Sequence, residues 1–84
     1  MSAHLTSRPL TQTDRDVLSC FRLRGSWSRN EILARCYPPD RSAQQRGPRD
    51  IDRLIRDGYL RQDPYGALVL DDRGIEFAHK GGVA

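Results

Sequence analysis

Apolar positions recur at helical spacing in three segments of this chain and then change to two short apolar runs. In the first segment, Val17, Leu18 and Phe21 lie on one face of a helix, because residues three or four apart share a side. Thr11 is placed to cap this helix, and Gly25 is placed to end it in a left-handed turn. The sequence therefore predicts a first helix between these two residues.

The second segment has a well-specified beginning. Ser28 and Glu31 form an S-x-x-E capping box, in which each side chain bonds the backbone amide of the other residue. Trp27 precedes the cap and Ile32 lies four residues beyond it, which is the spacing of a hydrophobic staple. The pair Pro38-Pro39 predicts the end of this helix, because proline donates no amide hydrogen and disfavours helical geometry in the residue before it.

The third segment ends at Gly58, and its apolar residues share one face: Ile51, Leu54 and Ile55. Its beginning can be read in two ways. Ser42 and Gln45 can cap an early start, whereas Gly47-Pro48 favours a start at that point, with proline in the first helical position. We predict the later start, preceded at most by one loose helical turn.

Two short apolar runs after the third helix, at 59–61 and 67–70, predict a β-hairpin. Asp63-Pro64-Tyr65-Gly66 supplies its turn, because proline suits the second position and glycine the fourth. A two-stranded hairpin is not stable by itself. Three leucines are therefore expected to anchor it to the helices: Leu60, Leu68 and Leu70.

The two ends of the chain complete the predicted organisation. Asp71 can cap a last short helix, which holds three apolar residues: Ile75, Phe77 and Ala78. Residues 1–9 are expected to form a flexible arm and residues 80–84 a frayed tail. The region 10–79 between them is short enough to be a single domain.

Three helices followed by a hairpin is the element order of a winged helix-turn-helix domain. The chain carries L-T-x-x-D-x-x-V-L at 10–18, E-I-L at 31–33, D-R-L-I-R-D-G-Y-L at 52–60 and L-D-D-R-G-I-E-F-A at 70–78. In these motifs it resembles the DNA-binding core of MarR- and PadR-type bacterial transcriptional regulators. The resemblance implies an α+β, mostly helical fold, in which a three-helix core carries a two-stranded wing and a short C-terminal helix.

Four arginines of the third segment are spaced three, four and three residues apart: Arg46, Arg49, Arg53 and Arg56. At about 100° per residue they form a stripe centred roughly 180° from the apolar face. They are therefore predicted to point away from the core, as a helix in a DNA major groove requires. The alternative is a solvated face with ion pairs, because Asp52 and Arg56 have the i, i+4 spacing of a helical pair.

By the same resemblance, the exposed start of the third helix contacts bases. Arg49 and Arg53 are candidates for reading guanine, with Gln44 and Gln45 beside them for adenine. Phosphate contacts are expected at the start of the second helix, from Ser28, Arg29 and Asn30. Candidates at the base of the hairpin are Arg61 and Arg73.

The predicted wing tip departs from the family, because an aspartate stands where arginine or lysine commonly enters the minor groove. Tyr65 in this tip either packs against a sugar or lies on the surface. The formal net charge of +3 is mild, and Lys80 is the only lysine.

Several function classes are not expected. No glycine-rich phosphate loop is present, and neither histidine stands near a nucleophile at a recognisable spacing, so no enzyme activity and no cofactor are predicted. Cys20 and Cys36 are too few and too far apart for a zinc ribbon, so no metal site is predicted and both are expected to be reduced packing residues. The chain has no apolar run that could span a membrane and no signal-peptide core at its start, so a cytoplasmic location is expected.

The leading hypothesis is sequence-specific binding of double-stranded DNA by a small transcriptional regulator, with the 49–56 helix in the major groove. The alternative is a winged-helix module that binds protein instead of DNA, which the acidic tip and the modest charge favour. No small-molecule ligand is evident. Whether the chain forms a homodimer stays open; a dimer would use the first helix or the terminal segments.

Overall fold

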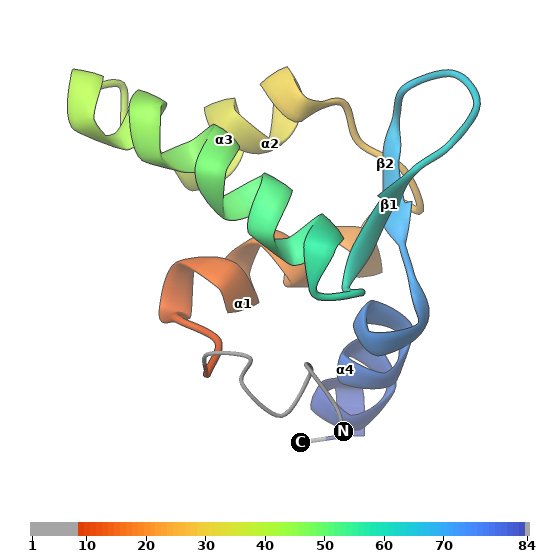
Figure 1. Cartoon of the computed structure of the whole chain (residues 1–84). Coiled ribbons are helices and arrows are strands. Elements are labelled where there is room, and N and C mark those ends of the chain that lie inside the picture. The colour runs from red at the N-terminus through yellow and green to blue at the C-terminus, as the bar shows by residue number, and fades with distance from the viewer. Residues whose placement is uncertain (1–8, 84) are drawn as a thin grey trace.

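The computed structural model describes residues 9–83, which form an α+β fold that is mostly helical (Figure 1). Within this range a two-stranded antiparallel sheet stands beside four α-helices and one short 3₁₀ helix. The elements in chain order are α1 (Gln12–Ser19), η2 (Cys20–Arg22), α2 (Arg29–Cys36), α3 (Arg41–Arg56), β1 (Leu60–Gln62), β2 (Leu68–Leu70) and α4 (Asp72–Val83).

Helix α1 begins as predicted and ends earlier than predicted. The Thr11 hydroxyl accepts the Asp14 amide at 3.1 Å, and the Asp14 carboxylate accepts the Thr11 amide at 3.1 Å, so a full capping box starts the helix. The helix stops at Ser19 and tightens into η2, and Gly25 does not take a left-handed conformation. The indole N–H of Trp27 donates to the carbonyl oxygens of Cys20 and Arg24, which satisfies this end without a glycine turn. The prediction of a left-handed stop at Gly25 is wrong.

Helix α2 follows the prediction closely. Ser28 is its N-cap and forms the capping box with Glu31. Trp27 and Ile32, the two residues of the predicted staple, are both buried in the core. Tyr37 ends the helix in an extended conformation directly before Pro38, the geometry that a following proline imposes.

Helix α3 begins at Arg41, seven residues before Pro48, so the predicted later start is wrong. The carboxylate of Asp40 accepts the Ala43 amide at 2.7 Å and caps the early start. Gly47 is buried where α3 crosses α2, and a side chain added there would collide with Leu33. This glycine therefore allows close packing between the two helices, and α3 continues through Pro48 although proline lacks the amide donor of one helical hydrogen bond.

The end of α3 at Gly58 is confirmed. Gly58 has φ +87°, its amide donates to the Ile55 carbonyl oxygen at 3.1 Å, and the Tyr59 amide donates to Leu54 at 2.9 Å. These two bonds are those of a Schellman motif, in which glycine is favoured because the conformation is left-handed. The motif turns the chain directly from α3 into β1.

The predicted hairpin is present. Strand β1 is shifted by one residue toward the C-terminus, and β2 begins one residue later than predicted. Leu60 pairs with Leu70, and Gln62 pairs with Leu68. The turn is closed by a hydrogen bond from the Gly66 amide to the Asp63 carbonyl oxygen at 3.0 Å, as the spacing predicts. Trp27 adds an isolated antiparallel bridge to Leu68 on the other side of β2.

Helix α4 extends farther than the short helix predicted. The Asp71 carboxylate accepts the Asp72 amide, and the helix continues to Val83. The predicted flexible arm lies outside the described residues except for Pro9, and so does Ala84 of the predicted tail. No described helix combines the length and apolar character needed to cross a bilayer.

The core lies between the first three helices and the hairpin. Leu60 and Leu68 are fully buried, and Leu70 packs against them half-buried, so the predicted anchoring of the hairpin is confirmed. The buried apolar residues are Val17, Leu18, Cys20, Phe21, Trp27, Ile32, Tyr37, Ala43, Ile51, Leu54, Leu60 and Leu68.

Candidate functional site

The buried side of α3 is not centred where the apolar pattern predicted. Ala43, Gly47 and Asp50 are buried together with Ile51 and Leu54. At about 100° per residue, these additional positions move the core-facing direction about 50° around the helix. The arginine stripe is therefore divided: one pair remains on the outer face and the other pair turns toward α1.

Arg53 belongs to the pair that turns inward. Its side chain is only 18% exposed, and its Nη2 lies 3.0 Å from Asp50 Oδ1 and 3.4 Å from Asp14 Oδ1. Both carboxylates are buried, and the guanidinium lies between them. The prediction that Arg53 points away from the core is wrong, because its charge compensates two buried acids within the fold.

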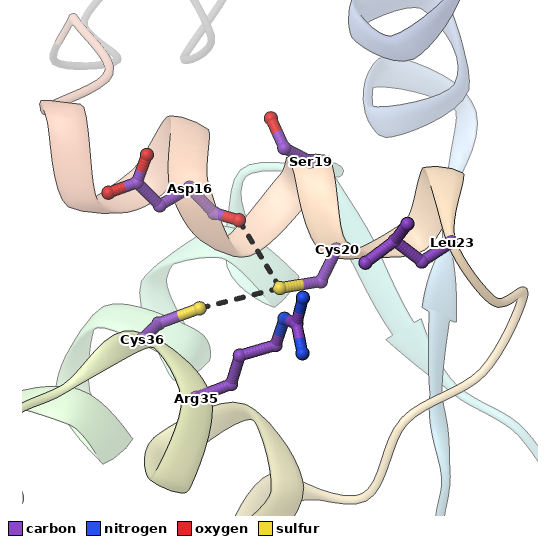
Figure 2. A pocket seen from close by; sticks show the side chains of 6 residues that line it. All are labelled: Asp16, Ser19, Cys20, Leu23, Arg35 and Cys36. Atoms are coloured by element: carbon purple, nitrogen blue, oxygen red, sulfur yellow. Dashed lines mark hydrogen bonds between the residues drawn. The ribbon is translucent and has the colours of Figure 1, made fainter.

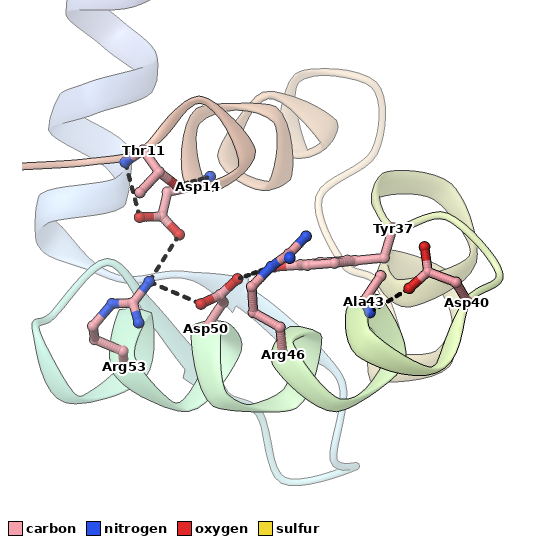
Figure 3. A network of polar contacts seen from close by, with 8 residues as sticks. All are labelled: Thr11, Asp14, Tyr37, Asp40, Ala43, Arg46, Asp50 and Arg53. Atoms are coloured by element: carbon pink, nitrogen blue, oxygen red, sulfur yellow. Dashed lines mark hydrogen bonds and ion pairs between the residues drawn. The ribbon is translucent and has the colours of Figure 1, made fainter.

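The same buried network continues through Asp50 to the end of α2 (Figure 3). The Tyr37 hydroxyl donates to Asp50 Oδ2 at 2.7 Å. Burial, and then this hydrogen bond, raise the pKa of Tyr37 well above its usual range. Arg46 lies at the rim of the network, with Nε 3.8 Å from Asp50 Oδ2 and its guanidinium 5.7 Å from the centre of the Tyr37 ring.

This network ties three helices together, since Asp14 belongs to α1, Tyr37 caps α2, and Asp50 and Arg53 belong to α3. Sequence reasoning missed it. The helical spacing of Arg46, Asp50 and Arg53 was a usable signal. The contact between Arg53 and Asp14, which lie 39 residues apart in the chain, had no such signal in the sequence.

The outer face of α3 is formed by six exposed polar residues of the helix: Arg41, Ser42, Gln45, Arg49, Asp52 and Arg56. Within residues 9–83, Arg41, Arg49 and Arg56 take part in no ion pair. Arg41 was not among the predicted contacts, because the predicted helix began after it. Gln44, the other predicted adenine reader, donates to the Pro38 carbonyl oxygen at 3.3 Å.

Asp52 is the one acidic residue on this outer face. Its carboxylate bonds Arg29 of α2 at 2.7 Å, in place of the helical pair with Arg56 that a solvated face would use. Arg29 was predicted to contact phosphate, and the structure pairs it with this aspartate. The pair leaves the positive charge of the neighbouring arginines uncompensated.

The start of α2 is occupied by its own side chains. Glu31 accepts the Ser28 amide at 2.8 Å and lies 2.8 Å from Arg24. The Ser28 amide and then Arg24 hold the pKa of Glu31 below its usual value. Of the three residues predicted there, Ser28 is engaged in the capping box, while Asn30 is exposed beside it.

The hairpin presents Tyr65 at its tip, 94% exposed. The Asp63 carboxylate accepts the amides of Tyr65 and Ala67, so it holds the turn together. Arg61 is exposed on β1. Arg73 lies instead over the Tyr59 ring at 4.5 Å and donates to the Asp57 carbonyl oxygen, which places it at the joint between α3, β1 and α4.

A depression of about 380 Å³ lies between the start of α1 and the flank of α3. It is lined by Thr11, Thr13, Arg46, Arg49, Asp50 and Arg53. Arg46 and Arg53 are paired with Asp50 there.

The chain was also compared with known proteins. No family model matches it, and neither a curated protein nor a solved structure matches it.

Proposed function

We propose that this chain is a winged helix-turn-helix domain that binds double-stranded DNA and acts as a small transcriptional regulator. Its element order supports this proposal: a helix, the bridging residue Trp27, two further helices, and a hairpin that follows α3 after a connection of only three residues. In this arrangement α3 is the recognition helix and the hairpin is the wing.

The observation that carries the proposal is the outer face of α3, with three arginines free of ion pairs in the described part of the chain. Arg49 and Arg56 lie two helical turns apart, or about 10 Å at 1.5 Å per residue. That separation is within the roughly 12 Å width of the major groove. Arginine can bond guanine with two hydrogen bonds, and Gln45 on the same face can do so with adenine.

The surroundings of this face favour an anionic partner. The bond between Arg29 and Asp52 offsets the acid that would otherwise repel a phosphate. Arg41 at the helix start extends the positive face by two more turns beyond Arg49. Arg61 on β1 adds a cation at the base of the wing, where the DNA backbone would pass.

The test is selection of bound duplexes from a random pool, followed by measurement of affinity against salt. One variant carries Arg49→Ala and Arg56→Ala together. Its matched control carries Arg15→Ala and Arg22→Ala, which remove the same charge from exposed positions on α1 and η2.

We expect the wild-type protein to recover one sequence motif. For the variant on α3, that preference should be lost, or the slope of log K against log salt should fall by about 1.8 if both arginines meet phosphates. The control variant should change neither the sequence preference nor the salt slope by a comparable amount. Equal effects of the two variants would exclude the outer face of α3 as the binding surface.

A wild-type protein that retains no duplex at low salt would favour the second candidate, a winged-helix module that binds protein. The fully exposed Tyr65 beside an aspartate is the observation in favour of that candidate. A palindromic motif with half-sites about one helical turn apart would indicate that a homodimer binds.

A further inference from the structure

The two cysteines, 16 residues apart in the chain, meet in the fold (Figure 2). Their Sγ atoms lie 3.4 Å apart, and both are free thiols. Cys20 is the first residue of η2, and Cys36 is the last residue of α2. The contact therefore joins the ends of two helices.

We propose that Cys20 and Cys36 are a modification site, where a hydroperoxide oxidises the pair to a reversible intramolecular disulfide. A disulfide has an S–S distance of about 2.05 Å, so the two sulfur atoms need to approach by only about 1.3 Å. The fold thus holds the two sulfur atoms in contact before any bond forms.

The pair is open to a small oxidant. A cavity of about 310 Å³ is lined by both cysteines and by Asp16, Ser19 and Arg35. Figure 2 shows the two sulfur atoms facing each other in this cavity, with the Arg35 side chain beside them. A hydroperoxide is small enough to enter it and reach sulfur.

The chemistry proceeds in two steps. The thiolate of one cysteine attacks one peroxide oxygen, the O–O bond breaks, and hydroxide leaves, so this cysteine becomes a sulfenic acid. The thiol sulfur of the other cysteine then attacks the sulfenic sulfur, the S–O bond breaks, and water leaves. The two cysteines lose two electrons to the peroxide, and with hydrogen peroxide the net products are one disulfide and two waters.

Burial, and then the neighbouring Cys20 thiol, raise the pKa of Cys36 to about 12, so Cys36 keeps its thiol hydrogen at neutral pH in the reduced protein.

The disulfide would act on the helices that support α3. Cys36 is followed directly by Tyr37, whose hydroxyl bonds Asp50 of α3 at 2.7 Å. The disulfide would close a loop between two cysteines that lie 16 residues apart in the chain. Closing this loop removes conformational freedom from the unfolded chain, so the oxidised protein should be the more stable form.

The test treats the wild-type protein with hydrogen peroxide and measures the intact mass after alkylation of remaining thiols. We expect a monomer that has lost two hydrogens and resists alkylation, and that reverts with dithiothreitol. Its thermal midpoint should lie about 10 °C or more above that of the reduced protein. Cys20→Ser and Cys36→Ser variants should each fail to form this species.

Three results would overturn the proposal: retention of both thiols, accumulation of sulfinic or sulfonic acid in place of the bridge, or bridging only between molecules. Repeating the oxidation in concentrated urea tests whether the fold matters. The bridged fraction should fall there, because the fold no longer holds the sulfurs together. An equal fraction in urea would refute the role of the folded geometry. None of these readouts depends on DNA binding.

Discussion

Replacing Arg53 with alanine would leave Asp14 and Asp50 buried without the cation that lies between them. An isolated buried carboxylate is costly, because the protein interior solvates charge far less well than water. The same substitution at Arg49, one turn earlier on α3, removes an exposed guanidinium that forms no ion pair within residues 9–83. The two variants thus differ only in what the arginine contacts.

The magnitude follows from the burial of the pair. Removing one partner of a buried ion pair typically costs about 3–5 kcal/mol. Here the lower end is appropriate, because the Tyr37 hydroxyl still bonds Asp50 and the Thr11 amide still bonds Asp14. A loss of about 3 kcal/mol lowers the thermal midpoint of a domain of this size by about 12–24 °C. The Arg49 variant should change the free energy of unfolding by less than about 0.5 kcal/mol.

Urea titration followed by far-ultraviolet circular dichroism measures both free energies of unfolding. We expect the Arg53 variant to unfold at a much lower urea concentration than the wild type. The Arg49 variant should unfold at nearly the same urea concentration as the wild type. Free energies of unfolding of the two variants that agree within about 0.5 kcal/mol would refute the structural role assigned to Arg53. The same difference is the reason that Arg53 is unsuitable as a variant for a DNA-binding assay.

Two further predictions concern packing and ionisation. Gly74→Ala would place a methyl group against the Tyr59 carbonyl oxygen and the Leu70 side chain, so we expect the free energy of unfolding from urea titration to fall by about 1–3 kcal/mol. The control is Gly25→Ala, whose methyl group meets open space and should change the free energy of unfolding by no more than about 0.5 kcal/mol. The pKa of Tyr37 is higher in the folded protein than in the unfolded chain. Its contribution to the free energy of unfolding is therefore fully present below pH 10. Above pH 10 this contribution falls by up to about 1.4 kcal/mol per pH unit, because the tyrosine hydroxyl of the unfolded chain loses its proton first. Tyr37→Phe should remove that part of the slope, and an equally steep fall in the variant would contradict the assignment.

Several features predicted correctly from the sequence depend on neighbours in the chain. The capping box of Ser28 and Glu31 and the left-handed Gly58 depend on residues within one or two turns, and both are present. The turn from Asp63 to Gly66 also forms as its own four residues predict. Local hydrogen bonding is sufficient to specify such features.

Other features were missed or predicted wrongly because they depend on residues far apart in the sequence. Gly47 was read as a helix boundary, because its contact with Leu33 exists only after two helices pack. Arg53 was placed on the outer face, because the three apolar residues of α3 gave no sign that Asp50 would be buried with them. The contact between Cys20 and Cys36 was missed for the same reason, since sequence spacing alone gives no distance between two helix ends.

The bridge between Trp27 and Leu68 has a consequence for the behaviour of the chain at high concentration. An unpaired strand edge is a template on which another molecule can add a strand, which leads to aggregation. The Leu68 amide and carbonyl are both bonded to Trp27, at 2.7 and 3.0 Å, so the start of the outer edge of β2 is already paired within the same molecule. The opposite edge belongs to β1, which is three residues long and carries the exposed Arg61. One edge is thus paired at its start and the other is short and charged, so the sheet offers little backbone for self-association.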